Sequence, residues 1–247
     1  MRLLLSIALT LVCMMLRASP AAGTAPVAAD SMEERVRPCV ACHRPEGLAG
    51  RDAYYPRIAG KPAGYLFNQL LNFREGRRHY RPMSVLIEHL SDEYLREMSA
   101  HFASLSPPYP PPQPTGLSAA DAGRARMLVN TGDRQRNIPA CAACHGEALM
   151  GVAPAIPGLL GLPRDYINAQ FGAWRNKTRR ARPPDCMADI ASRLMPAEAS
   201  TLATWLAAQP VLANAKPAAA TKSALPLDCG GLDNKVRNET GPGGRSR

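Results

Sequence analysis

Apolar side chains recur at helical spacing in several stretches of the chain. Between residues 64 and 74, Tyr65, Leu66, Leu70 and Phe73 fall on one side of a helix. No stretch keeps the strict alternation of apolar and polar residues that a half-buried strand requires. The patterns therefore predict an all-α fold, with helices over residues 64–74, 91–105, 118–130, 165–175 and 196–209.

The apolar stretch at the N-terminus is of a different kind. Residues 3–16 are mostly apolar, Arg2 precedes them, and small residues follow up to Ala22. A bilayer-spanning helix needs about 20 apolar residues, so this shorter stretch is typical of an export signal. We expect residues 1–24 to be a signal peptide cleaved near Ala22, with Cys13 lost alongside it; an uncleaved anchor is the alternative.

The rest of the chain contains two copies of one sequence pattern. Cys-Val-Ala-Cys-His at 39–43 matches Cys-Ala-Ala-Cys-His at 141–145. Further matches follow at a constant offset of 101 residues, where Pro62, Tyr65, Gln69, Phe73 and Arg74 correspond to Pro163, Tyr166, Gln170, Trp174 and Arg175. Two copies are too few for a repeat solenoid, so we expect two tandem globular domains.

Composition sets the boundaries of these domains. A proline-rich linker at 107–116 separates a first domain at 30–106 from a second at 117–210. Proline-rich segments act as semi-rigid spacers. The tail at 211–247 is rich in Ala, Pro, Gly and charged residues, and we expect it to be mostly disordered.

The Cys-x-x-Cys-His motif is the attachment site of c-type haem. Two thiols about one helical turn apart can add to the two vinyl groups of one porphyrin, and the histidine that follows binds the iron. The sequence therefore predicts two covalent haem c groups, attached through Cys39, Cys42, Cys141 and Cys144, with His43 and His145 as the proximal ligands.

Two other uses of the cysteines were weighed. A four-cysteine zinc site would leave both motif histidines unexplained and would divide one site between two domains. A thioredoxin-type redox pair requires a strand–helix context that the sequence lacks. Haem attachment is the better interpretation.

The sixth iron ligand must come from farther along the chain. Met83 lies 40 residues after His43, and Met187 lies 42 residues after His145, each in an expected loop that follows a basic stretch. A thioether in this position raises the reduction potential of the haem. The first domain also contains competing histidines without counterparts in the second, namely His79, His89 and His101.

Charge narrows the range of partners. The formal net charge is +10, and the expected signal peptide accounts for two of these charges. A basic protein suits an acidic protein partner, a nucleic acid or a membrane surface. No basic run is interleaved with aromatic residues as in a nucleic-acid groove, so we expect no nucleic-acid binding.

Four places in the sequence carry a family resemblance. These are the two Cys-x-x-Cys-His motifs, Tyr-Tyr-Pro-Arg-Ile-Ala-Gly at 54–60, and Ile-Pro-Gly-Leu at 156–159. In these places the sequence resembles the diheme cytochrome c4 family. The resemblance covers nearly all of residues 36–210. It implies two class I cytochrome c domains in the periplasm and His/Met ligation of both irons, with Met83 and Met187 as the distal ligands. It also implies electron transfer with membrane oxidases or dehydrogenases, and hence possible membrane association through a partner.

The sequence departs from that family in a few places. Arg44 stands where the family usually has glycine, and the helix before Cys39 looks short. Cys186 directly precedes Met187, and Cys229 lies in the tail. Spare cysteines in an oxidising compartment suggest a disulfide. A Cys186–Cys229 bridge is one possibility, and two free thiols or Cys186 as an iron ligand are the others.

Three functions fit these features. The first is a soluble electron shuttle that docks through a small, salt-sensitive contact with an acidic partner face. The second is the electron-accepting subunit of a larger oxidoreductase. The third is an enzyme such as a diheme peroxidase or a thiosulfate-oxidising cytochrome, which needs an open or displaceable iron ligand. We expect an electron-transfer protein with no catalytic residues.

Overall fold

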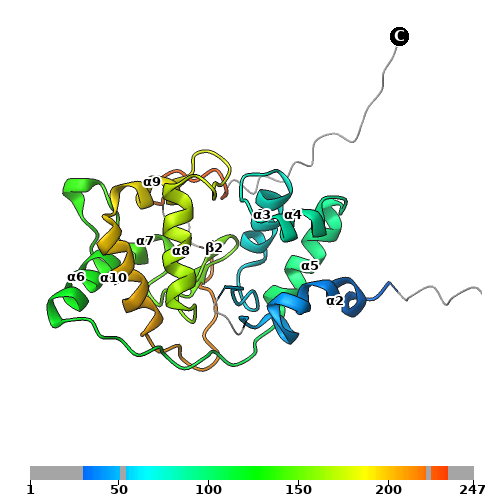
Figure 1. Cartoon of the computed structure of the whole chain (residues 1–247), viewed down its shortest axis with the longest axis horizontal. Helices are drawn as coiled ribbons and strands as arrows, with labels where there is room; N and C mark the ends of the chain where they lie inside the picture. The colour runs from blue at the N-terminus through cyan, green and yellow to red at the C-terminus, as the bar shows by residue number, and fades with distance from the viewer. Residues whose placement is uncertain (1–29, 51–53, 221–223, 233–247) are drawn as a thin grey trace, which may run out of the picture.

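The computed structural model describes residues 30–50, 54–220 and 224–232, so the expected signal peptide and its cleavage site lie outside the described residues. Two groups of helices lie side by side, and an extended segment runs along one edge of the molecule to join them (Figure 1). The first group comprises α2 (Met32–His43), η1 (Pro45–Gly47), α3 (Ala63–Arg74), α4 (Arg81–Ile87) and α5 (Asp92–Ser104). The second comprises α6 (Ala119–Asn130), η2 (Arg134–Arg136), α7 (Cys141–His145), β1 (Gly151–Val152), β2 (Ile156–Pro157), α8 (Arg164–Arg175), α9 (Cys186–Arg193) and α10 (Pro196–Ala207).

Each group of helices has its own hydrophobic core. In the first unit α3 packs on α5, and Leu95, Met98 and Phe102 of α5 are buried at the helical spacing that the sequence predicts. In the second unit α8 packs on α10, where Leu202 and Leu206 are buried. The helical fold expected from the sequence is therefore present, with a separate core in each half.

Hydroxyl caps fix where two of these helices begin. The Ser91 side chain accepts a hydrogen bond from the Tyr94 backbone N–H at 3.1 Å, and the Ser118 side chain accepts one from Asp121 at 3.1 Å. These bonds satisfy backbone donors that have no partner inside the helix. The predicted starts of α5 and α6 are therefore accurate to one residue.

The structure differs from the sequence interpretation in two local respects. A short antiparallel pair, β1 and β2, follows the second Cys-x-x-Cys-His motif, although two residues per strand are too few to produce an alternating pattern. Met83 and Met187 lie in the first turns of short helices and not in loops. Pro82 favours the start of α4, and the Asp185 side chain caps α9 by accepting from Ala188 N at 3.1 Å.

The proline-rich linker is held on both sides. The Arg57 guanidinium donates to the carbonyls of Pro107 at 2.5 Å and Pro108 at 2.9 Å, and it stacks 3.9 Å from the Tyr109 ring. Gln113 N donates to Ala207 O at 2.9 Å. The linker therefore contacts both units.

Part of the tail is docked, contrary to the disorder expected from its composition. Ala218 exchanges hydrogen bonds with Gly151 and Ala153 beside β1, both at 2.8 Å. Residues 224–232 lie against the second unit, where Cys229 forms a disulfide with Cys186. A covalent tether lowers the entropic cost of ordering a segment, which composition alone does not reveal.

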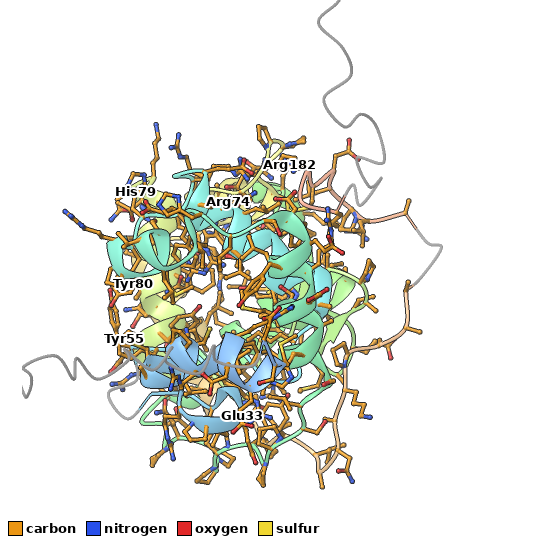
Figure 2. All side chains as sticks on the ribbon, turned by 90° about the vertical axis from the view of Figure 1, so that its right-hand side faces the viewer. Glu33, Tyr55, Arg74, His79, Tyr80 and Arg182 are labelled. Carbon is orange, nitrogen blue, oxygen red and sulfur yellow. A yellow bond between two sulfur atoms is a disulfide. The ribbon has the colours of Figure 1, made fainter. Side chains whose placement is uncertain are left out.

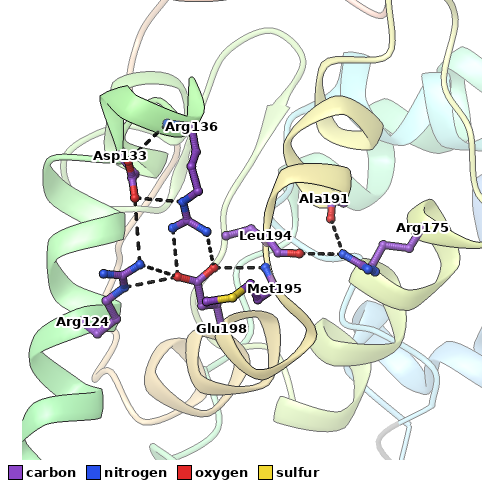
Figure 3. A network of polar contacts seen from close by, with 8 residues as sticks. All are labelled: Arg124, Asp133, Arg136, Arg175, Ala191, Leu194, Met195 and Glu198. Carbon is purple, nitrogen blue, oxygen red and sulfur yellow. Dashed lines mark hydrogen bonds and ion pairs between the residues drawn. The ribbon is translucent and has the colours of Figure 1, made fainter.

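A buried carboxylate joins three elements of the second unit (Figure 3). Glu198 of α10 is 7% exposed and accepts hydrogen bonds from Arg124 of α6 at 2.6 Å and from Arg136 of η2 at 2.7 and 2.9 Å. Asp133 accepts a further bond from Arg136 at 2.9 Å. The bonds to Arg136 and Arg124 lower the pKa of Glu198 from its usual 4.5 to about 2.

We expect Glu198→Gln to lower the free energy of unfolding of the second unit by about 2 to 3 kcal/mol, because two arginines lose their charged partner. A carboxylate with a depressed pKa contributes stability above its unfolded-state pKa. The wild type therefore loses this contribution as the pH falls from 4.5 towards 2, and the variant does not. Urea unfolding of the haem-loaded protein between pH 7 and pH 3 measures both effects. Glu147→Gln, at an exposed position of the same unit, is the control, and an equal loss in both variants would contradict this role.

No helix in the described part of the chain is long and apolar enough to cross a membrane.

Candidate functional site

Each unit has a cavity behind its Cys-x-x-Cys-His motif, and residues of the other unit complete its lining. In the first unit, Cys39, Cys42, His43 and Met83 all line a cavity of about 580 Å³. In the second unit, the matching residues Cys141, Cys144, His145 and Met187 line a cavity of about 220 Å³. The structure therefore brings together, in each unit, the thiols, the histidine and the methionine that the sequence singles out.

The motif histidines are held in the same way in both units. His43 Nδ1 lies 3.0 Å from the carbonyl oxygen of Pro56, and His145 Nδ1 lies 2.7 Å from that of Pro157. Donation from Nδ1–H fixes the ring and leaves Nε2 as the free nitrogen, the usual arrangement for a histidine that binds a metal. Both rings are over 90% buried, and burial lowers the pKa of each, which favours the neutral imidazole that a metal requires.

The paired cysteines do not resemble zinc ligands or redox thiolates. No cluster of three or more His, Cys, Asp or Glu side chains suited to a metal ion occurs among the described residues, so the structure does not support a four-cysteine site. Burial raises the pKa of the Cys39 and Cys141 thiols to about 11. Reactive thiolates require the opposite shift.

The methionine helices are anchored by a repeated contact. The Arg74 guanidinium at the end of α3 donates to Leu90 O at 2.7 Å, just after α4. Its counterpart Arg175 at the end of α8 donates to Leu194 O at 2.6 Å, just after α9 (Figure 3). In each unit, the equivalent arginine thus holds the end of the helix that carries the methionine.

The three histidines that could replace Met83 as an iron ligand in the first unit differ in position. His89 is exposed and lies beside Glu88, and the His101 ring packs edge-on against Phe102. Neither lines the first cavity, whereas His79 does. Figure 2 looks onto this unit and shows His79 above Tyr80 and Tyr55, whose hydroxyls are 3.2 Å apart at the cavity wall.

The two departures noted at Arg44 and Cys186 are also resolved in the structure. Arg44 has φ 58° and ψ 165°, almost the conformation of its counterpart Gly146 at φ 80° and ψ 152°, so the turn after the motif is the same in both units. The helix that ends in the first motif, α2, has 12 residues including the motif, so about two turns precede Cys39, whereas α6, before the second motif, has 12 residues of its own. The Cys186 sulfur is bonded to Cys229, which leaves no thiolate there to bind iron.

A wall of polar side chains lies between the two cavities. The two units contribute equivalent residues to it, and these make reciprocal contacts. Arg78 donates to Tyr166 at 3.3 Å and to Gln170 at 2.9 Å in the second unit. Arg179 donates to Tyr65 at 3.3 Å and to Gln69 at 3.2 Å in the first unit. The two arginines pair as an antiparallel bridge, and Arg180 N donates to Arg77 O at 2.8 Å beside them.

This wall carries positive charge without a carboxylate partner. Among the described residues, Arg78, Arg179 and Lys61 form no ion pair, although Arg179 is 6% exposed. Burial lowers the pKa of Lys61 to about 8 and also lowers that of Arg179. In the sequence, Arg179 belongs to a dense basic stretch with Lys177, Arg180 and Arg182, which is typical of a solvated face, whereas the structure buries it. Lys61 and Arg78 were not singled out, although Arg78 and Arg179 share the 101-residue offset of the repeat and could have been found by it.

One buried donor next to the wall has no protein partner. Trp174 Nε1 is buried without a hydrogen-bond acceptor among the described residues, and the Trp174 side chain lines the second cavity. The Arg179 guanidinium lies 4.0 Å from the Trp174 ring. Unpaired buried donors are rare, so this N–H and the neighbouring cations suit an anionic acceptor.

The comparisons with known proteins agree with this geometry. No family model matches the chain. The thiosulfate dehydrogenase electron acceptor of Thiomonas intermedia is 38% identical over 174 residues, which is 70% of this chain and 79% of the relative.

Solved structures lead to the same group of proteins. The thiosulfate dehydrogenase TsdBA of Marichromatium purpuratum matches with a TM-score of 0.62 and 34% identity over 70% of this chain, which spans only 36% of that longer protein. The cytochrome c4 of Acidithiobacillus ferrooxidans matches with a TM-score of 0.58 and 26% identity, over 70% of this chain and 99% of the other. The chain therefore belongs to the cytochrome c4-like family of diheme c-type cytochromes, electron-transfer proteins that carry two covalently bound haem c groups.

Proposed function

We propose that this chain is a periplasmic electron carrier whose two haem irons are each bound by one histidine and one methionine. His43 with Met83 and His145 with Met187 are the ligand pairs, and the paired cysteines hold the porphyrins. The observation that carries the proposal is that the same four groups line a cavity in both units, with each histidine oriented by a proline carbonyl.

The residues around each cavity fit a haem. Haem supplies an iron that accepts and releases one electron, and covalent attachment keeps it in a small domain. Arg78, Arg179 and Lys61 offer unpaired positive charge for its carboxylates, and Trp174 Nε1 offers a donor. Since both cavities share this wall, the same cations would lie beside both haems, and electrons could pass from one unit to the other across it.

The names of the relatives support a class of partner. The Thiomonas relative is named an electron acceptor of thiosulfate dehydrogenase, and TsdBA is itself a thiosulfate dehydrogenase. We infer that this chain accepts electrons from an exported thiosulfate-oxidising enzyme, through an acidic face on that enzyme. It then passes them to a membrane oxidase, so it associates with the membrane only through that partner.

Rapid-mixing absorbance tests this assignment. The oxidised protein should be reduced within seconds when thiosulfate and a thiosulfate dehydrogenase from the same host are both present, with the rate falling as salt rises. Thiosulfate alone should leave the protein oxidised, because both irons have two ligands and no open position.

Two outcomes would contradict the proposal. Steady thiosulfate oxidation by this chain without the dehydrogenase would make it an enzyme. A failure of the dehydrogenase to reduce the protein, while a chemical reductant reduces both haems, would remove this partner and leave the electron-carrier assignment intact.

A further inference from the structure

A segment of the tail covers the second cavity, and the described part of the chain contains no counterpart at the first. Leu225, Leu227 and Cys229 alternate with the exposed residues Pro226 and Asp228, so their side chains face one way. All three line the second cavity, together with Gly231 and Leu232. No described tail residue lines the first cavity. We call residues 224–232 the strap.

The strap is fastened to both units. Its Cys229 is disulfide-bonded to Cys186, with the Cα atoms 5.3 Å apart. Gly230 N donates to Pro184 O at 2.9 Å, and the Asn68 side chain of α3, in the first unit, donates to Gly231 O at 2.6 Å. The strap therefore crosses from the loop before α9 to the neighbouring unit and lies over the second cavity.

These attachments converge on the start of α9. Cys186 is the first residue of that helix and Met187 the second. The preceding loop is tied by Asp185, which accepts from Ala181 N at 2.6 Å as well as from Ala188 N. Gly230 packs so closely on this loop that a Cβ at that position would lie 2.0 Å from Pro183 O. The position of Met187 therefore depends on the strap from one side and on the loop from the other.

We propose that the strap is a positioning element for the second haem, which holds Met187 at the iron and keeps water out of the second cavity. This inference rests on the proposed His/Met ligation. Leu225 and Leu227 supply apolar cover, and a less hydrated haem favours the ferrous form because the extra charge of ferric iron is poorly solvated. Among the described residues no tail segment covers the first cavity, so the two haems differ in their retention of the methionine and in potential.

Two variants that act by different routes test this role. The double variant Cys186→Ser with Cys229→Ser removes the tether and leaves no free thiol near the iron. Gly230→Ala keeps the disulfide but forces the strap away from Pro183. Pro226→Ala is the matched control, because Pro226 is an exposed strap residue that does not line the second cavity.

The readouts are the NMR signals of iron-bound methionine methyl groups, one per haem, and the potential of each haem. Met83→Ala and Met187→Ala assign the signals. In both strap variants we expect the Met187 signal to broaden or vanish, and the ratio of reduced to oxidised second haem at a fixed potential to fall about tenfold, or about 59 mV. The Met83 signal, the first haem and the Pro226→Ala protein should match the wild type.

Unchanged signals and potentials in either folded strap variant would overturn the proposal, as would equal shifts at both haems. Haem content per chain identifies a variant that fails to fold, and Gly230→Ala, with its disulfide intact, then carries the test alone. A wild type without any Met187 signal would instead contradict the proposed ligation, so the two failures can be told apart.

Discussion

Replacing Met187 by alanine is expected to remove half of the far-red iron–thioether absorption and to lower one of the two reduction potentials by roughly 0.1 to 0.3 V. The same change at Met83 should remove the other half and lower the other potential. The effect is large because axial ligands set haem potentials over about 0.8 V, and loss of a thioether favours the ferric form. Oxidised absorption spectra and a potentiometric titration of each purified variant measure it.

The chain offers matched controls for this experiment. Met150 is 7% exposed in the core of the second unit and Met195 is 54% exposed, and neither lines a cavity. Their replacement by leucine should leave the thioether band at full strength. A Met83→Ala protein that keeps the whole band would show that the first iron has another ligand, and His79 is then the residue in the first cavity to test.

The second large effect is expected at the polar wall. Arg179 lines both cavities, so Arg179→Gln should lower the potentials of both haems, because a positive charge near the iron favours the reduced form. A unit charge acting over about 8 Å at an effective dielectric constant near 20 contributes about 2 kcal/mol, or roughly 0.1 V. Potentiometric titration at pH 7 measures the shift.

Charge and shape can be separated at this position. Arg179→Lys keeps the charge but not the forked contacts to Tyr65 and Gln69, so it should restore most of the potential. Arg126→Gln removes an exposed arginine of α6 away from both cavities and should have no effect. If Arg126→Gln lowers the potentials as much as Arg179→Gln, then the position of Arg179 in the buried wall does not determine the haem potentials.

The sequence alone was informative where chemistry requires a fixed linear spacing. Haem attachment needs two thiols and a histidine within five residues, so the motif is visible without a structure. The duplication made Met83 and Met187 stand out among ten methionines, because each follows its motif at nearly the same distance. Helix periodicity and serine caps also gave the starts of α5 and α6 to within a residue.

Features that depend on distant segments meeting in space were harder to predict. The wall of Arg78 and Arg179 exists only because the two units pack face to face, and neither arginine belongs to a recognised motif. The tail was expected to be mostly disordered because it is rich in Ala, Pro, Gly and charged residues, whereas a single disulfide and two inward-facing leucines dock the strap within it. The cysteine pair was the one sequence feature that suggested this docking.

The most direct test of the diheme carrier is a reductive titration of the purified, exported protein, with haem quantified per chain. We predict two covalent haems, two electrons taken up per chain, and a thioether band in the oxidised spectrum that corresponds to both irons. One haem per chain, or a band at half strength or absent in the wild type, would contradict the account.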